Sequence, residues 1–250
     1  MKMDVNDLSF AYGKDHILNS ISFSVEEGER LIIIGNNGVG KTTLLKCLNQ
    51  MLEPKKGLIT FNDINLNTYS HKELAKLMAY VPQSISYTEQ NVFETVLLGR
   101  KPYINFQPSI NDYLKTETII NQLSLQHLAL KNTNQLSGGE RQKVAIARAL
   151  NQESKIILMD EPTANLDIKK QLELSDFIID ISSKNKIMMI ISMHDINLAL
   201  RIGTKFLVLK ESNIYAFGDK SIITKQLIND VFNVNSKTVY DNDTLHFIYE

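Results

Sequence analysis

Gly35-Asn36-Asn37-Gly38-Val39-Gly40-Lys41-Thr42 is the stretch that decides which fold this chain can adopt. It satisfies the pattern G-x-x-x-x-G-K-[ST], in which glycines let backbone N–H groups converge on phosphate oxygens. Residues 31–34 before it are continuously apolar, as in a buried strand, and the residues from Lys41 onward have the spacing of a helix. The N-terminus of such a helix adds its dipole to anion binding. The stretch therefore predicts a phosphate-binding loop.

The pattern also assigns tasks to individual residues of this loop. Lys41 is expected to reach the β- and γ-phosphates of a nucleotide, and the Thr42 hydroxyl is a candidate Mg²⁺ ligand. All eight residues of the loop, together with Thr43, are candidate nucleotide contacts. A glycine-rich turn without a ligand is the alternative interpretation, and the flanking strand and helix patterns argue against it.

Composition limits the classes of protein to which the chain can belong. With 250 residues, 43% of them hydrophobic, it can bury the core of one large domain or two small ones. The formal net charge of −1 offers no basic surface, so we expect no nucleic-acid partner. The single cysteine, Cys47, excludes an intrachain disulfide and has the apolar surroundings of a small core residue.

Other candidate features are absent from the sequence. No run of about 18 apolar residues occurs, so we expect no membrane span. The opening residues Met1-Lys2-Met3-Asp4 are not followed by the apolar run of a secretory signal. The five histidines are scattered without ligand spacing, which argues against a transition-metal site.

Two hydrophobic patterns predict two kinds of strand. Residues 5–10 and 21–25 alternate apolar and polar side chains, which is typical of half-exposed antiparallel strands. Residues 31–34, 156–159 and 187–191 are continuously apolar and predict a parallel sheet that is covered on both faces. Near the end, residues 206–209 and 214–217 predict a hairpin, and residues 245–249 predict a last strand.

The predicted fold is α/β, a P-loop nucleotide-hydrolase core with a mostly parallel sheet. The alternating strands predict an N-terminal antiparallel β subdomain, and residues of about 90–151 predict an inserted helical subdomain. We expect one domain that spans residues 1–250. In open α/β sheets, ligands bind beyond the carboxyl ends of the strands, so chemical groups at those ends are expected to meet.

Asp160 and Glu161 follow one buried strand, and His194 follows another. Two adjacent carboxylates at a strand end are unfavourable unless they bind or react with something. Beside a phosphate loop, Asp160 is expected to hold Mg²⁺, directly or through water, and Glu161 to polarise an attacking water as general base. His194 is a candidate for orienting the γ-phosphate or that water. The alternatives are a carboxylate pair that caps a turn before Pro162, and a structural histidine.

A second glycine-rich element is Leu136-Ser137-Gly138-Gly139-Glu140, which precedes a predicted helix over residues 141–150. Its unpaired backbone N–H groups and the helix dipole would also attract an anion. Taken alone, Ser-Gly-Gly is equally typical of an ordinary helix cap.

Taken together, these motifs resemble those of the ATP-binding subunits of ABC transporters along nearly the whole chain. Residues 136–140 resemble the family's signature, and residues 157–163 resemble its Walker B segment. Asn165-Leu166-Asp167 resembles the D loop, and residues 193–195 resemble the segment that carries the switch histidine. Residues 81–83 resemble the Q loop, which adds Gln83 as a nucleotide and Mg²⁺ contact. Residues 10–13 resemble the A loop, whose Tyr12 would stack on adenine. For Tyr12 the alternative is core packing beside Phe10, and for Gln83 it is a solvated polar residue.

The resemblance implies partners that one chain's spacing cannot reveal. In this family two subunits face head to tail, so Ser137, Gly138, Gly139 and Glu140 would serve the nucleotide of a second copy. ATP would close the dimer and hydrolysis would reopen it. Gln83 and the helical lobe would pass this motion to two membrane-spanning permease subunits at the cytoplasmic face of the cell membrane, with a substrate-binding protein acting indirectly.

The segment Glu94–Tyr103, which contains Leu-Gly-Arg-Lys-Pro-Tyr, and the tail at residues 217–234 resemble those of importers of iron-siderophore, haem and cobalamin chelates. A docking helix common to many ABC subunits is the alternative interpretation of the tail. The loop departs from the family's pattern at Asn36, where proline is frequent, and at Thr42, where serine is commoner. Neither departure removes a phosphate or Mg²⁺ contact.

Other classes fit the chain less well. ABC proteins of translation or DNA repair need a second cassette or a long coiled coil, and a non-hydrolysing scaffold would be expected to lack Glu161 or His194. Molybdate or tungstate import and a separate-subunit exporter stay open as alternatives for the transported cargo.

Overall fold

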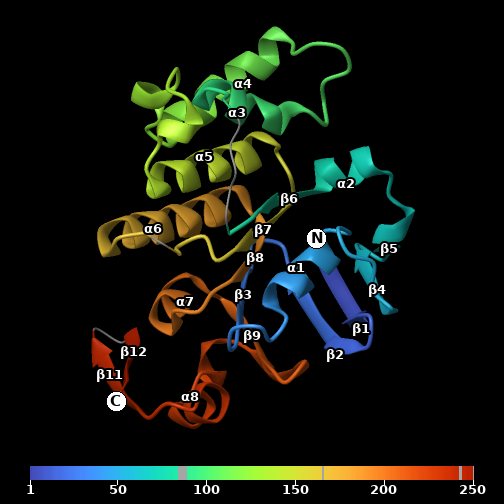
Figure 1. Ribbon diagram of the computed structural model, residues 1–250, viewed down its shortest axis with the longest axis vertical. Coiled ribbons are helices and arrows are strands. Elements are labelled where there is room, and N and C mark those ends of the chain that lie inside the picture. The colour runs from blue at the N-terminus through green and yellow to red at the C-terminus, as the bar shows by residue number, and fades with distance from the viewer. Residues whose placement is uncertain (84–88, 165, 242–243, 250) are drawn as a thin grey trace.

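A six-stranded sheet in the order β10-β9-β3-β8-β7-β6 forms the centre of the computed structural model, which describes residues 1–83, 89–164, 166–241 and 244–249 (Figure 1). All neighbouring strands are parallel except β9 and β10. The strands are β3 (Arg30–Ile34), β6 (Met78–Val81), β7 (Ile156–Asp160), β8 (Met188–Ser192), β9 (Lys205–Lys210) and β10 (Asn213–Gly218). Every residue of β7 and β8 is buried, as their continuously apolar sequences predict.

Side chains of β3 alternate between two hydrophobic cores on opposite faces of this sheet. Leu31 and Ile33 pack in a core with α1 (Lys41–Leu48) and the N-terminal strands. Ile32 and Ile34 pack in the other core, with α6 (Ile168–Asn185), α7 (Ile196–Ile202) and part of the helical subdomain. The sheet is therefore covered on both faces, and this burial is the largest favourable term for its folding.

The predicted N-terminal antiparallel subdomain is a four-stranded sheet in the order β2-β1-β4-β5. Its strands are β1 (Lys2–Tyr12), β2 (Asp15–Glu26), β4 (Lys56–Phe61) and β5 (Ile64–Asn65). β1 and β2 contain the two predicted strands, and each is longer than the predicted ranges, residues 5–10 and 21–25. The sequence did not indicate β4 or β5, because the first half of β4 is exposed and its Gly57 lies against the backbone of Leu8.

The inserted helical subdomain occupies the upper part of Figure 1. After α2 (His71–Leu77) and β6, it consists of α3 (Val92–Leu97), α4 (Ile110–Gln122) and α5 (Gly138–Asn151), with the 3₁₀ turns η2 (Leu98–Arg100), η3 (Gln126–Leu128) and η4 (Thr133–Gln135). An earlier 3₁₀ turn, η1 (Leu66–Thr68), follows β5. Val144 and Ala147 of α5 are buried in the same core as Ile32, so α5 joins the helical lobe to the sheet.

The chain ends in a segment below the sheet in Figure 1. It comprises η5 (Lys220–Ile222), α8 (Lys225–Phe232) and a hairpin of β11 (Ser236–Asp241) and β12 (Thr244–Tyr249). The predicted last strand is β12, and its partner β11 was not predicted. Asn197 of α7 exchanges two hydrogen bonds with the backbone of Phe247, at 3.0 and 2.9 Å, and so anchors the hairpin.

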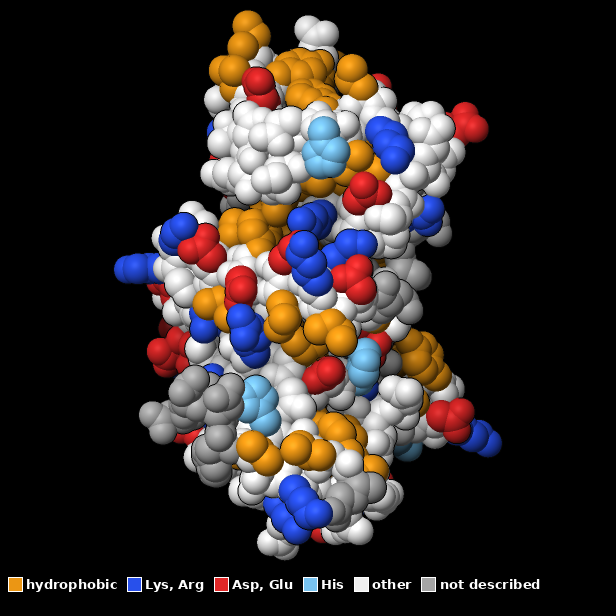
Figure 2. Space-filling model, turned by 90° about the vertical axis from the view of Figure 1, so that its left-hand side faces the viewer, with side chains coloured by type: hydrophobic (Ala, Val, Ile, Leu, Met, Phe, Trp, Pro, Cys, Tyr) orange, Lys and Arg blue, Asp and Glu red, His pale blue; other side chains and the backbone are white. Residues whose placement is uncertain are grey.

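The surface carries charges of both signs. Lysines and arginines are interspersed with aspartates and glutamates on the face shown in Figure 2, in keeping with the formal net charge of −1. None of the described helices combines the length and apolarity needed to cross a membrane.

Candidate functional site

The phosphate loop connects β3 to α1, as predicted, and two of its glycines occupy positions that other residues would strain. Gly35 has φ of +152°, and a Cβ there would collide with the carbonyl oxygen of Leu209. Gly40 has φ of +106°, and its Cβ would lie 3.0 Å from the carbonyl oxygen of Ile17. Gly40 also caps α1 without a side chain, so the first N–H groups of this helix are left for an anion.

The ammonium group of Lys41 lies inside the loop. It donates to the carbonyl oxygens of Gly35 at 2.8 Å and Asn36 at 3.2 Å, and only 6% of the residue is exposed. Burial lowers the pKa of Lys41, while the nearby carboxylates of Glu161 and Asp160 oppose that shift. A desolvated cation held by weak neutral acceptors is well prepared to bind a phosphate group.

A cavity of about 490 Å³ lies over this loop. It brings together residues from five parts of the chain: the end of β1, the start of β2, the loop with the start of α1, the segment after β6, and the segment after β7. The lining residues are Tyr12, Ile17, Asn37, Gly38, Gly40, Lys41, Thr42, Thr43, Gln83 and Glu161. The predicted site residues that do not line it are Gly35, Asn36, Val39, Asp160, His194 and residues 137–140.

Asp160 is held by its neighbours at the carboxyl ends of the parallel strands. It pairs in register with Ser192 of β8, whose hydroxyl donates to Asp160 Oδ1 at 2.5 Å. The Tyr80 hydroxyl lies 3.5 Å from the other carboxylate oxygen, and burial together with this carboxylate raises the pKa of Tyr80. Asp160 is 3% exposed, so its orientation is fixed by packing as well as by hydrogen bonds.

Glu161 has a strained backbone and a side chain that points to the other predicted residues. Its φ is +46°, which is unusual for a residue with a Cβ. Gln83 donates to Glu161 Oε2 at 2.7 Å, and His194 Nδ1 lies 3.7 Å from the same oxygen. Gln83 and His194 thus converge on one carboxylate oxygen of Glu161, next to the phosphate loop.

Tyr12 is half-exposed at the mouth of the cavity, with 50% of its surface accessible. Its ring contacts the buried Phe10 edge to face, with 4.8 Å between the ring centroids. The structure therefore does not place Tyr12 in the core, which was the alternative interpretation of its sequence. Phe10 supports the ring from one side and leaves surface for a ligand.

The signature segment begins α5 and forms a complete capping box. Ser137 Oγ accepts from the Glu140 N–H at 3.4 Å, and the Ser137 N–H donates to Glu140 Oε2 at 2.7 Å. Hydrogen bonds to its carboxylate from the side chain and then the backbone N–H of Ser137 lower the pKa of Glu140. The side chain of Glu140 is thereby engaged within its own helix cap. In the D loop, Asp167 caps α6 by accepting from the Lys170 N–H at 2.9 Å, while Asn165 lies outside the described residues.

Sequence reasoning missed Ser192 and Tyr80 as members of this site. Both support Asp160 across the sheet, and neither belongs to a short motif. The available signal for Ser192 was its position as the polar end of a continuously apolar strand, two residues before His194.

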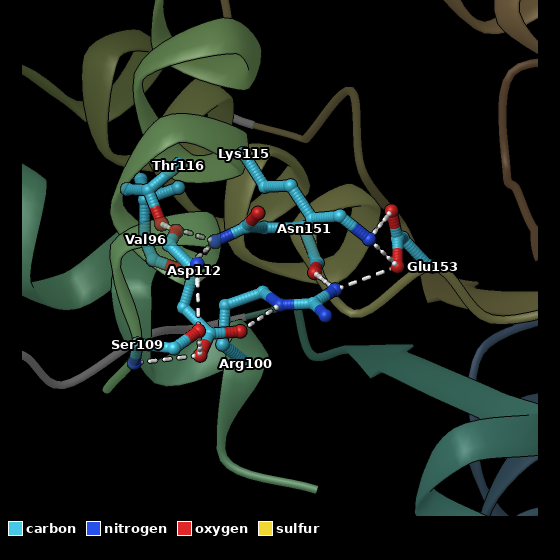
Figure 3. A network of polar contacts seen from close by, with 8 residues as sticks. All are labelled: Val96, Arg100, Ser109, Asp112, Lys115, Thr116, Asn151 and Glu153. Atoms are coloured by element: carbon cyan, nitrogen blue, oxygen red, sulfur yellow. Dashed lines mark hydrogen bonds and ion pairs between the residues drawn. The ribbon is translucent and has the colours of Figure 1, made fainter. Parts of the chain in front are cut away.

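Arg100, from the segment that suggested a subfamily, lies in a polar network inside the helical lobe (Figure 3). Its guanidinium donates to Asp112 at 3.0 Å, to the Asn151 carbonyl at 2.9 Å and to Glu153 at 2.8 Å. Arg100 is 3% exposed and Asp112 is 6% exposed. Lys115 completes the network with an ion pair to Glu153 at 2.7 Å. The network ties η2 and α4 to the end of α5.

Comparison with known proteins identifies the family. Residues 18–164, more than half of the chain, match the family model described as ABC transporter. The chain belongs to the ABC transporter family. It is an ATP-binding subunit and an ATPase, as its resemblance to this family implied.

Relatives match this ABC subunit over almost its whole length. An uncharacterized ABC transporter ATP-binding protein of Methanocaldococcus jannaschii is 47% identical over 94% of this chain and 93% of that protein. The petrobactin import ATP-binding protein FpuD of Bacillus anthracis is 31% identical over 96% of this chain and 89% of that protein.

Solved structures confirm the ABC ATPase fold. An inward-facing transporter assigned to the metal-chelate type has a TM-score of 0.87 and 30% identity, covering 99% of this chain and 96% of that chain. The ATP-binding cassette MJ0796, a dimer bound to ADP and phosphate in a post-hydrolysis state, has a TM-score of 0.77 and 25% identity. The match covers 87% of this chain and 98% of that one.

Proposed function

We propose that this ABC subunit energises the import of a metal chelate, such as an iron-siderophore, haem or cobalamin. The observation that carries the proposal is the match over 99% of the chain to a transporter of the metal-chelate type. The relative named for petrobactin import supports it. Arg100 supports this proposal less than its sequence motif suggested. Its contacts with Asp112, Asn151 and Glu153 stabilise the helical lobe, and this structural role is enough to explain the motif. Molybdate or tungstate import and a separate-subunit exporter are the competing assignments.

ATP is bound in the cavity over the phosphate loop. Tyr12 stacks on the adenine ring, the N–H groups of residues 35–43 surround the phosphates, and Lys41 neutralises their charge. The oxygen-bearing side chains of Thr42, Gln83 and Asp160 fit Mg²⁺, which prefers oxygen ligands. Asp160 is buried and already bonded to Ser192, so it suits a contact through water. When bound, Mg²⁺ offsets the negative charge of the phosphates.

Glu161 acts as the general base for ATP hydrolysis. Its carboxylate accepts a proton from the attacking water, while Gln83 and His194 orient that carboxylate from two sides. His194 has a side chain that is 56% exposed, so it can reposition when ATP enters. The position of Glu161 depends on Ser192, because Ser192 binds its backbone N–H.

A second copy of the chain completes each ATP site. Within one chain, residues 137–140 do not line the cavity that holds Lys41. Ser137, Gly138 and Gly139 instead contact the nucleotide of the partner from the N-terminus of α5, and the solved cassette dimer supports this arrangement. The capping box keeps Glu140 close to this contact as a structural support.

Two membrane-spanning permease subunits bind the ABC subunit at the cytoplasmic face of the cell membrane, and a substrate-binding protein delivers the cargo to them. A groove between α2 and the helical lobe is a suitable docking surface for a permease. It is lined by residues from both sides, including His71, Lys72, Leu98, Pro102 and Arg148. A change in the angle between the helical lobe and the core would change the shape of this groove. Such a change would couple ATP binding and hydrolysis to transport.

Mixing two inactive variants tests the shared ATP site. Lys41→Ala removes phosphate neutralisation, and Ser137→Arg crowds the partner's γ-phosphate, so each variant alone is expected to lose ATPase activity. In a mixture, each heterodimer has one intact site, so activity should return to about a quarter of wild type for independent sites. Mixtures as inactive as the separate variants would contradict composite sites. Ser137→Ala controls for the lost helix cap.

Uptake assays test the cargo. The subunit is reconstituted in vesicles with its permease and binding protein, and uptake of an iron-siderophore, haem, cobalamin and molybdate is compared. ATP-dependent accumulation of one of the chelates supports the proposal, and accumulation of molybdate alone contradicts it. A Glu161→Gln subunit in the same vesicles gives the background.

A further inference from the structure

Asn36 connects the phosphate loop to the C-terminal helix. Its side-chain amide nitrogen donates to the carbonyl oxygen of Val231 at 2.7 Å. Val231 is the second-to-last residue of α8, and the last four carbonyls of a helix have no partner within it. The loop pattern allows any residue type at position 36, so phosphate binding does not by itself require an asparagine there.

While the side chain of Asn36 contacts α8, its backbone contacts Lys41 in the phosphate loop. Its carbonyl oxygen accepts from Lys41 Nζ at 3.2 Å and from the Val39 N–H at 3.3 Å. A rotation of residue 36 would therefore move an acceptor of the Lys41 ammonium group. Through one residue, the position of α8 is transmitted to Lys41.

The helix at the other end of this connection is firmly anchored. Leu227, Ile228 and Val231 are at most 5% exposed and belong to the core that includes Ile34 of β3. The Tyr215 hydroxyl of β10 donates to Asp230 at 2.7 Å. α8 is thus a fixed support against which a glycine-rich loop can be held.

Electrostatics explain why a neutral amide suits position 36. The C-terminus of a helix carries a partial negative charge of about half an elementary charge, which would repel an incoming phosphate. The Asn36 amide satisfies the Val231 carbonyl without adding a charge. An aspartate at this position would place a carboxylate against that carbonyl and beside the phosphates.

We propose that Asn36 is a positioning residue, which holds the phosphate loop on α8 so that ATP affinity depends on the C-terminal segment. The inference rests on the proposed ATP site. Because coupling between two sites is reciprocal, ATP binding in turn stabilises the end of α8.

Nucleotide titration of purified variants tests this role. Loss of one hydrogen bond in Asn36→Ala should weaken MgATP binding about 5- to 10-fold, with little change in kcat at saturating ATP. Asn36→Asp should weaken it further. The matched control is Asn229→Ala on α8, whose side chain contacts only Asn235, at 3.3 Å, among the hydrogen bonds identified, and whose ATP affinity should equal wild type.

Hydrogen exchange, measured first on the wild-type protein and then on Asn36→Ala, provides a second test. ATP should slow exchange of the amides at the end of α8, including Asn233, and this protection should be lost in Asn36→Ala. The proposal is overturned if ATP leaves α8 exchange unchanged in the wild type, or if Asn36→Ala binds ATP normally while Lys41→Ala does not. If Lys41→Ala also binds normally, the proposed ATP site itself is wrong.

Discussion

Ser192 and Glu161 are joined twice across adjacent strand ends. The Glu161 N–H is within 3.0 Å of Ser192 Oγ and 3.1 Å of the Ser192 carbonyl oxygen. The same Ser192 hydroxyl donates to Asp160. One small side chain therefore positions both the proposed Mg²⁺ residue and the proposed general base.

Ser192→Ala is expected to lower ATPase activity about 10- to 100-fold, because residues that orient a metal-binding group commonly have effects of this size. The defect should shrink at high Mg²⁺ concentration if Asp160 acts on the metal. The measurement is kcat as a function of Mg²⁺ concentration. Ser175→Ala is the matched control, since Ser175 is equally buried but donates within α6. Normal activity in Ser192→Ala would remove Ser192 from the site.

The strained backbone of Glu161 leads to a prediction about stability. Glu161→Gln and Glu161→Gly both remove the carboxylate, so both should abolish hydrolysis while leaving ATP binding intact. Only the glycine variant relieves the positive φ, so its free energy of unfolding should exceed that of Glu161→Gln by about 1 kcal/mol. Denaturant unfolding of the two variants measures this difference.

A matched pair of glycine and glutamine variants in a helix should show a difference in unfolding free energy of the opposite sign. Glu173 is in α6, where glycine is about 1 kcal/mol less favourable than good helix formers. Glu173→Gly should therefore be less stable than Glu173→Gln. If both pairs show the same sign, strain at Glu161 is not the cause.

Asp112 is expected to make stability depend on pH. Hydrogen bonds from Ser109, and then Arg100, lower its pKa to about 2, from an ordinary value of 3.8. A carboxyl whose pKa is lowered by folding stabilises the protein above its unfolded value and loses that contribution as pH falls towards 2. Unfolding free energies of the wild type at pH 5, 4 and 3 should decline more steeply than those of Asp112→Asn.

The same substitution should also destabilise the protein at neutral pH, by about 2 kcal/mol, because it removes one of the two carboxylates that pair with the buried Arg100 and leaves only Glu153. Glu117→Gln, an exposed change on the same helix, serves as the control. Equal pH dependence in the wild type and Asp112→Asn would contradict a role for this ion pair.

The sequence predicted those parts of the site that depend on short patterns. Lys41 and the loop glycines follow from the geometry of phosphate binding, and the continuous strands placed Asp160, Glu161 and His194 at one sheet edge. Ser192 and Tyr80 were missed because their role arises from strand register, which links residues far apart in the chain. The strands β4, β5 and β11 were missed because each is short or exposed and gains its stability from tertiary pairing.

Asn36 and Arg100 illustrate two other limits. Asn36 was predicted as a nucleotide contact and noted as a departure from the family's pattern, but its contact with α8 was not predicted. Its partner is a backbone carbonyl at a sequence separation of 195, beyond the reach of any local pattern. Arg100 was interpreted as a marker of transported cargo. Its buried contacts with Asp112 and Glu153 give it a structural role that no local pattern specifies.

Tyr12 leads to the last prediction, in which two ligands separate stacking from phosphate binding. Tyr12→Ala removes the aromatic face at the cavity mouth and should weaken ATP binding at least 5-fold, since stacking of a base on an aromatic side chain contributes about 1–3 kcal/mol. Tyr12→Phe keeps the ring and should bind ATP as the wild type does. Tripolyphosphate has no base, so its affinity should be unchanged in both variants. Equal losses for ATP and tripolyphosphate in Tyr12→Ala would mean that Tyr12 supports the loop instead of the adenine ring.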